Sequence, residues 1–231
     1  MKQSWCHWVL AGVLISFCQF AQVSVHAADK ALAPAKLESG AAAAGRAVQS
    51  GSLESGSNAP VEEIPDWQAR LELARLLSYV KRYDESLAEY QKVLKEKPDL
   101  VDAQLEMAAV LYWSGHVGEA LNLLEQTPPE QLNPDSRLLL ADIYVTQKRY
   151  NLAEPIYREH LQKHPDDLAV RLKLAELLGY MKDYPQSIEE YQLILKARPD
   201  DIQVRRQYAM VLSWAGRHAE AIAELRKTLD R

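Results

Sequence analysis

The sequence predicts an all-α fold, a solenoid of about five stacked helix pairs, because four series of residues share one period. A small residue recurs in the 231-residue chain at spacings of 34, 33, 34 and 34, at Ala74, Ala108, Ala141, Ala175 and Ala209. A leucine or tyrosine follows three residues later each time, at Leu77, Leu111, Tyr144, Leu178 and Leu212. A second small series and a bulky series keep this register, at Ser86, Ala120, Ala153, Ser187 and Ala221 and at Tyr90, Leu124, Tyr157, Tyr191 and Leu225. Such a period indicates stacked helical hairpins, since small residues let helices approach closely and bulky ones fill the space beside them.

The first repeat shows how each helix pair is expected to form. Its first helix carries one apolar stripe, at Leu73, Leu76, Leu77 and Val80. Residues 81–84 supply a polar turn, and a second apolar stripe begins at Leu87. Pro98 ends the second helix because proline cannot continue it. We expect the same unit in residues 66–99, 100–132, 133–166, 167–200 and 201–231.

The ends of the repeats carry a shared signal and two irregularities. Proline followed by aspartate ends one helix and offers an N-cap for the next, at Pro98-Asp99, Pro165-Asp166-Asp167 and Pro199-Asp200-Asp201. In the second repeat the prolines come early, at Pro128 and Pro129, which predicts a short second helix and an irregular loop. Pro155 lies near the start of a second helix, where its missing N–H costs little and a mild kink is expected.

These repeats resemble the tetratricopeptide family. The copy in residues 172–200 has the family's leucine–alanine pair, turn aromatic, second small residue, second aromatic and closing proline, at Leu174, Ala175, Tyr184, Ser187, Tyr191 and Pro199. The second and fifth copies depart from the pattern, with Val117 and His218 in the turn and Leu124 and Leu225 at the second aromatic. The resemblance covers about residues 66–231. It implies antiparallel helix pairs stacked into a right-handed superhelix, and usually a scaffold for partner proteins.

The N-terminus predicts export from the cytoplasm. The apolar run over residues 8–21 is too short and too interrupted for a comfortable membrane span of ~20 residues. Residues 25–27 then offer small side chains at the two positions that signal peptidase reads. We expect a signal peptide over residues 1–27, cut after Ala27, and a periplasmic or secreted protein. The alternatives are an uncleaved anchor and a lipoprotein that begins at Cys18.

Residues 28–65 form a separate region by composition. They are rich in alanine, glycine, serine and proline and almost lack bulky apolar side chains. Such a segment cannot bury enough surface to offset its ordering entropy, so we expect a disordered tether. The tether could let the solenoid reach away from whatever holds the N-terminus, or it could be a leader without function.

Charge and cysteine usage limit the classes of partner. Removing residues 1–27 removes Lys2 and no carboxylate, so the formal net charge falls from −5 to −6. An acidic chain lacks the electrostatic footprint of a nucleic-acid binder, and no polybasic run predicts more than a peripheral contact with a membrane. Both cysteines, Cys6 and Cys18, lie in the expected signal peptide, which leaves no disulfide or thiol chemistry.

No motif in the chain predicts catalysis, a cofactor or a metal. The repeats contain no glycine-rich phosphate loop. His160 and His164 have a spacing that can chelate a metal when a third ligand is present, but Pro165 places His164 outside the helix, so a surface pair is expected. His116 and His218 occupy equivalent turns, where a polar residue is ordinary. We expect a non-enzymatic protein.

An aromatic row is the best candidate for a binding site. Two residues after each member of the Leu77 series lie Tyr79, Trp113, Thr146, Tyr180 and Trp214, and Tyr112 precedes one of the rings. In the tetratricopeptide architecture this position tends to face the concave groove, so stacked repeats would line the groove with rings. Tyrosine and tryptophan suit binding because they combine large apolar area with a polar group. The alternative is that the rings pack between repeats. The polar neighbours expected in the groove are Arg75, Glu106, Asp142, Glu176 and Arg206.

The sequence therefore favours an exported scaffold that binds a partner protein in its groove. A short run over residues 213–217 is similar to copies in periplasmic parts of exopolysaccharide-export proteins, which points to an envelope assembly. Binding of a carbohydrate polymer by the aromatic row is the alternative function. The fifth repeat carries no capping helix, so we expect an apolar strip at Ile222, Leu225 and Leu229. That strip would self-associate, dock on a partner, or continue into a longer protein.

Overall fold

The computed structural model describes residues 64–229. This part of the chain folds into ten α-helices and one short 3-10 helix, and it contains no β-strand. In chain order the elements are α2 (Asp66–Tyr79), α3 (Tyr83–Glu96), α4 (Val101–Trp113), α5 (Val117–Gln126), η1 (Pro129–Gln131), α6 (Pro134–Thr146), α7 (Tyr150–Lys163), α8 (Leu168–Tyr180), α9 (Tyr184–Ala197), α10 (Ile202–Trp214) and α11 (His218–Arg226). The expected signal peptide and almost all of the expected tether lie outside the described residues.

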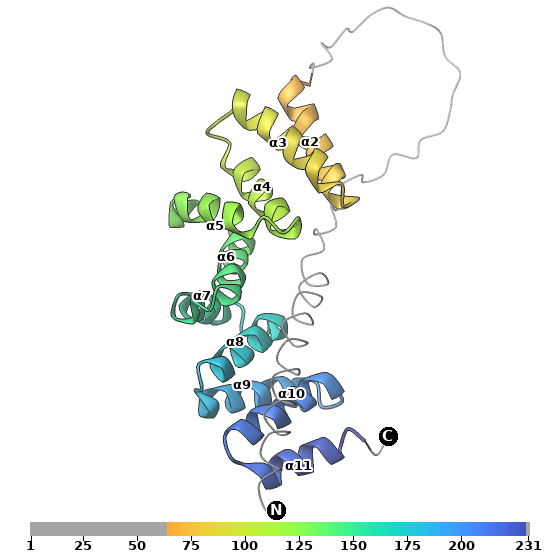
Figure 1. Cartoon of the computed structure of the whole chain (residues 1–231), viewed down its shortest axis with the longest axis vertical. Coiled ribbons are helices and arrows are strands. Elements are labelled where there is room, and N and C mark those ends of the chain that lie inside the picture. Colours follow the sequence, from red (N-terminus) through yellow and green to blue (C-terminus); the bar gives the residue numbers. More distant parts are fainter. Residues whose placement is uncertain (1–63, 230–231) are drawn as a thin grey trace, which may run out of the picture. The chain divides into compact units, whose positions relative to one another are not determined.

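The helices form five consecutive antiparallel pairs, α2–α3, α4–α5, α6–α7, α8–α9 and α10–α11 (Figure 1). Each second helix also packs against the first helix of the following pair. This is the α-solenoid that the period predicted. The core follows the period as well, because all five members of the Ala74 series are buried.

The two small series hold the helices of a pair together directly. The Ser86 hydroxyl donates a hydrogen bond of 2.7 Å to the backbone carbonyl of Ala74. Ser187 makes the same bond to Ala175 at 2.7 Å. Both serines are fully buried, so the bond satisfies a hydroxyl that would otherwise be costly to bury. In these two pairs a hydrogen bond between the two small-residue positions therefore links the helices.

The turn between the helices of every pair contains one residue in the left-handed region. That residue is glycine in two pairs and lysine in three, at Gly115, Gly216, Lys81, Lys148 and Lys182. The residue after it returns its N–H to a carbonyl five positions earlier, as in Arg82 to Leu77 at 2.9 Å. This bond closes the helix end, so the turn geometry is kept even where a lysine must adopt a positive φ.

The prediction of N-caps was right for the later repeats and wrong for Asp99. Asp167 and Asp201 accept hydrogen bonds from the first-turn N–H groups of α8 and α10. The N-cap of α4 is instead Leu100, and no side chain caps that helix. The later repeats have proline followed by two aspartates, and the second aspartate caps the helix. In the first repeat leucine stands at that second position, so the carboxylate of Asp99 comes one residue too early.

The second repeat is irregular, as its early prolines predicted. Its second helix, α5, spans 10 residues, whereas α3, α7 and α9 each span 14. The chain then passes through η1 to Asn133, whose side chain accepts the N–H of Ser136 at 2.8 Å and caps α6. Pro155 lies inside α7, just beyond its first turn.

Candidate functional site

The first helices of the five pairs share one stripe of residues. In α2 the stripe consists of Glu72, Arg75 and Tyr79, which lie three and four residues apart and so on the same side of the helix. Its counterparts are Glu106, Ala109 and Trp113 in α4, Leu139, Asp142 and Thr146 in α6, Lys173, Glu176 and Tyr180 in α8, and Gln207, Met210 and Trp214 in α10. We call this set the first-helix stripe. It contains eight of the ten residues that the sequence proposed for the groove.

Polar side chains of the stripe connect neighbouring first helices. Arg75 donates from Nε and Nη2 to the carboxylate of Glu106 at 2.9 and 2.8 Å. Lys173 donates to Asp142 at 2.6 Å. Gln207 donates to Glu176 at 2.7 Å. In all three links the residues are 31 positions apart, so the bonds form a ladder that follows the repeat.

The ladder lacks a rung between α4 and α6. The residues at the two corresponding positions are Ala109 and Leu139, which cannot form a polar link. Leu139 is buried and Ala109 is partly buried. The break therefore falls at the same junction as the shortened α5 and the irregular loop.

Tyrosine hydroxyls from the second helices support the ladder. Tyr90 donates to Glu106 at 3.1 Å, and Tyr157 donates to Asp142 at 2.5 Å. Burial is the main cause that raises the pKa of both phenols, and the neighbouring carboxylate raises it further. The phenols therefore stay protonated and act as fixed donors. Each of these two carboxylates is held by a cation and a tyrosine at once.

Glu176 differs from the other carboxylates of the stripe. Burial raises its pKa to about 7, while the hydrogen bond from Gln207 and the charge of Lys173 oppose that rise. Its hydrogen-bond donor, Gln207, is neutral, whereas Glu106 and Asp142 are bonded to Arg75 and Lys173. The pKa of Glu176 therefore lies close to neutral pH.

The aromatic row is both exposed and packed. Tyr79 is 70% exposed. Tyr180 is exposed at one side and stacks on Tyr150 of the preceding pair, with ring centroids 6.0 Å apart. Trp214 is also exposed, yet its ring lies 3.7 Å from the point where a Cβ on Gly179 would stand. Tyr180 and Trp214 therefore contact the preceding pair and still present surface to solvent.

The remaining residues that the sequence predicted for the groove are half-buried or lie outside the ladder. Tyr112 and Trp113 are half-buried and pack against the core. Burial raises the pKa of the Tyr112 phenol, and the charge of Asp142 adds to it. Arg206 does not join the ladder, because its guanidinium approaches Thr228 at 3.4 Å beside α11. Sequence reasoning missed Lys173 and Gln207, although their distance of 31 residues from a predicted groove residue repeats that of Arg75 and Glu106.

Comparison with known families decides where this chain belongs. The family model described as tetratricopeptide repeat matches residues 80–143 and 144–206, which together make up more than half of the chain. The chain belongs to the tetratricopeptide repeat family. Such proteins are typically non-enzymatic scaffolds for protein–protein interactions. A search of curated proteins found no match.

Solved tetratricopeptide repeat structures share the fold of this chain. A structure of MamA is 22% identical, with a TM-score of 0.63 over 71% of this chain and 90% of that one. A structure of MamA MSR-1 is 21% identical, with a TM-score of 0.62 over 71% of this chain and 95% of that one. YrrB, described as a TPR protein with an unusual peptide-binding site, is 18% identical, with a TM-score of 0.62 over 71% of this chain and 86% of that one.

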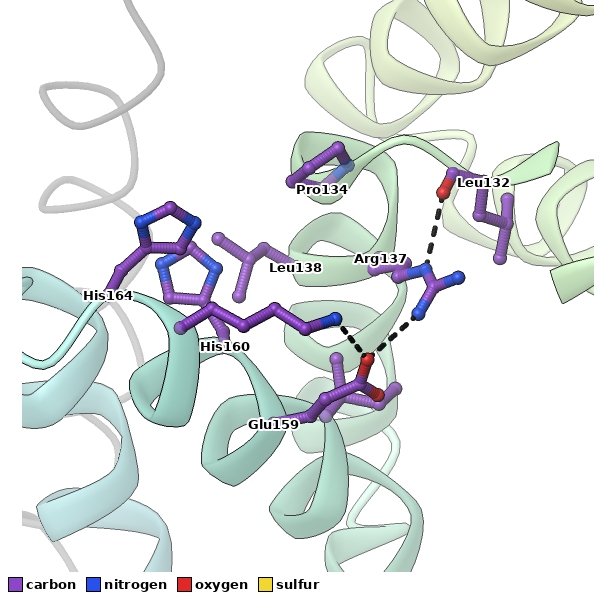
Figure 2. Close-up of a pocket in the computed structure, with 9 residues that line it drawn as sticks. Leu132, Pro134, Arg137, Leu138, Glu159, His160 and His164 are labelled. Carbon is purple, nitrogen blue, oxygen red and sulfur yellow. Dashed lines mark hydrogen bonds and ion pairs between the residues drawn. The ribbon is translucent and has the colours of Figure 1, made fainter. Parts of the chain in front are cut away.

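Two hollows indent this tetratricopeptide repeat domain. A hollow of about 620 Å³ lies beside the stripe at α2 and α4, with Leu71, Glu72 and Arg75 among its lining residues. A smaller one of about 190 Å³ lies between α6 and α7 (Figure 2). There Arg137 and Lys163 both bond to Glu159, at 3.2 and 2.7 Å. The larger hollow extends the candidate site, whereas the charges of the smaller one already satisfy one another.

The histidine pair lines the smaller hollow and has another partner. The rings of His160 and His164 lie 4.8 Å apart, and His160 approaches Asp167 at 2.9 Å. His164 follows the last residue of α7, as predicted. Residues 64–229 contain no group of three or more side chains placed to hold a metal ion. No helix in that range is long and apolar enough to cross a lipid bilayer.

Proposed function

We propose that this tetratricopeptide repeat protein is an exported scaffold that binds an extended segment of a partner protein along the first-helix stripe. The observation that carries the proposal is the exposure of aromatic rings at one repeat position in α2, α8 and α10. Tyrosine and tryptophan dominate binding hot spots, because they desolvate a large area and lose little rotamer entropy. Rings repeated along a stack of helices suit an extended ligand that contacts several pairs in turn.

The ladder supports this function by fixing the rings. Arg75 and Glu106 connect α2 to α4, and Glu176 and Gln207 connect α8 to α10. Arg75 and Glu176 lie four residues, about one helical turn, before Tyr79 and Tyr180. Glu106 and Gln207 lie seven residues, about two turns, before Trp113 and Trp214. A pre-ordered surface loses less entropy on binding than a mobile one. The polar rungs are therefore assigned to holding the surface, and the rings and the hollow at α2 to contacting the partner.

Export is part of the proposal and rests on the N-terminal sequence. The short apolar run and the small residues at positions 25–27 support a signal peptide cut after Ala27. A periplasmic or secreted scaffold then fits an envelope assembly, and an exopolysaccharide-export complex is the specific candidate. Mass spectrometry of the protein recovered from its source cells tests this step. A mature chain that begins at Ala28 is expected, and a chain that retains residues 1–27 in the cytoplasm would refute export.

Partner binding is tested by capture with matched variants. The wild-type chain, Tyr79→Ala and Leu193→Ala are each used as bait in an envelope extract of the source cells. Leu193 is an exposed apolar residue on α9, a second helix, so it controls for the loss of any exposed side chain. A specific partner should be captured by the wild type and by Leu193→Ala and be strongly reduced with Tyr79→Ala. Equal capture by all three would remove the stripe from the binding surface.

A carbohydrate polymer is the second candidate ligand, because exposed tyrosine and tryptophan rings also stack on sugars. Titration of the purified chain with soluble glycans, followed by tryptophan fluorescence, distinguishes the two. Trp214 is exposed and would report stacking directly. Saturable binding of a glycan, weakened by Tyr79→Ala, would favour a carbohydrate polymer over a protein as the ligand of the stripe.

A further inference from the structure

The first and last described helices of the solenoid expose leucine and isoleucine side chains whose counterparts in inner repeats are buried. At the first end, Leu76 of α2 is 64% exposed, whereas Leu177, at the same repeat position in α8, is 0% exposed. Leu73 is likewise exposed, and its counterpart Leu174 is buried. Each comparison keeps residue type and register constant. Among the described residues α8 has a preceding pair to pack against and α2 does not, so these side chains lie where a preceding second helix would pack.

The last described helix shows the complementary pattern. Leu225 of α11 is 40% exposed, whereas Leu124, at the same position in α5, is 0% exposed. Ile222 is exposed, and its counterpart Ile188 in α9 is buried. Both α5 and α9 pack against the first helix of the following pair. Ile222, Leu225 and Leu229 thus form the surface that receives a following first helix, as the sequence predicted for this apolar strip.

The structure repeats the joint between two such surfaces four times. In each of the four junctions the second helix of one pair packs against the first helix of the next, in the pairs α3·α4, α5·α6, α7·α8 and α9·α10. The exposed leucines of α2 and the exposed apolar strip of α11 are the two halves of this same joint. We propose that a second copy of this chain supplies the other half of this joint, so that α2 of one copy packs on α11 of another and the solenoid continues from chain to chain.

Charge at the rim of this joint agrees with the proposal. At the junction of the third and fourth pairs, Arg158 donates to Gln186 at 2.6 Å across 28 residues. The residue in the register of Arg158 on α11 is Arg226, and the residue in the register of Gln186 on α3 is Glu85. Both side chains are exposed, and Glu85 also accepts two hydrogen bonds from Arg82 at the start of its own helix. A head-to-tail joint would therefore place an arginine of one copy beside a glutamate of the other.

This contact is heterologous, because the two surfaces are different, and a heterologous contact that does not close gives open chains of molecules. It differs from a two-fold dimer in which α11 meets α11. The proposal uses the ends of the solenoid and not the first-helix stripe. The test of partner binding could therefore fail while the test of assembly succeeds, and assembly could fail while partner binding succeeds.

Two blocking variants test the joint. Leu76→Glu blocks the first end and leaves α11 intact, whereas Ile222→Glu blocks α11 and leaves the first end intact. Both residues are exposed, so the fold should persist, and far-ultraviolet circular dichroism checks this. Leu193→Glu, which alters an exposed leucine outside both ends, is the matched control. Sedimentation velocity at micromolar concentration measures the mass of each species.

The expected results follow from the polarity of the joint. The wild type and Leu193→Glu form species that grow with concentration, and each blocking variant alone is a monomer. An equimolar mixture of the two variants forms a species of twice the monomer mass that does not grow further, because each chain keeps one open end. Arg226→Glu should weaken wild-type assembly, and adding Glu85→Arg to the same chain should restore it. A monomeric wild type, assembly by either blocking variant alone, or a mixture that stays monomeric would each overturn the proposal.

Discussion

Arg75 and Glu106 lie on successive first helices and share two hydrogen bonds, although 31 residues separate them in the chain. Glu106 also accepts the hydroxyl of Tyr90, and Arg75 bonds to Glu72 in its own helix. The carboxylate hydrogen bond is the main cause that raises the pKa of Arg75. The pair therefore belongs to a network that joins two repeats, and its strength can be measured.

A double-mutant cycle on Arg75→Ala and Glu106→Ala should give a coupling of about 0.5–1 kcal/mol. The value is modest because both side chains remain partly exposed and solvent screens them. Urea unfolding of the wild type, the two single variants and the double variant measures it. The control pair is Arg82 and Glu85, an exposed bidentate contact between residues three apart, which should give a smaller coupling. A coupling no larger than the control's would show that the rung does not join the repeats.

The period of the sequence was enough to predict the helix pairs and the buried alanines. Small residues at a constant register leave one way to stack the helices, so the Ala74 series could be assigned without coordinates. The ladder was harder to predict from the sequence. Lys173 and Gln207 resemble ordinary surface residues in the sequence, and only the stacking of the repeats brings them beside Asp142 and Glu176. The positive φ of the turn lysines also has no sequence signal, since lysine rarely adopts it.

The titration of Glu176 makes stability depend on pH in one direction. Its pKa is raised from 4.5 to about 7 in the folded protein, mainly by burial, so the folded state holds this proton more tightly than the unfolded state. The stabilisation is therefore fully present at pH values below the pKa of Glu176 in the unfolded chain, and it is lost as the pH rises through the pKa of Glu176 in the folded protein.

Glu176→Gln tests that direction, because the amide keeps an acceptor for Gln207 and cannot ionise. We expect the variant to be more stable than the wild type at about pH 8, with the difference shrinking towards about pH 5. Chemical denaturation at both pH values measures it. Glu189→Gln, an exposed substitution on α9, should change stability little at either pH. A Glu176→Gln variant that is less stable at the higher pH would contradict the assignment.

Two glycines should respond to alanine with opposite signs. Gly179 lies in α8, and a Cβ there would meet Ser187 and Val211 at 3.5 Å, which is ordinary contact. Gly179→Ala should therefore stabilise the protein by about 0.5 kcal/mol through helix propensity. Gly216 has a φ of 77°, so Gly216→Ala should destabilise by about 1 kcal/mol. Thermal melts of both variants compare them directly, and a loss of stability in Gly179→Ala would mean that Trp214 needs the space.

The aromatic row gives the final prediction, since its rings differ in how much they pack. Tyr79→Ala, Trp113→Ala and Trp214→Ala should each weaken binding of the partner by roughly 1–2 kcal/mol, within the range of interface hot spots. Tyr79 is largely exposed, so its variant should melt as the wild type does. Trp113 packs against the core and Trp214 lies close to Gly179, so these two variants should also melt at a lower temperature. Calorimetric titration and thermal melts on the same samples separate affinity from stability. Unchanged affinity in Tyr79→Ala, together with a lower melting temperature in both tryptophan variants, would show that the row serves only to pack the repeats together.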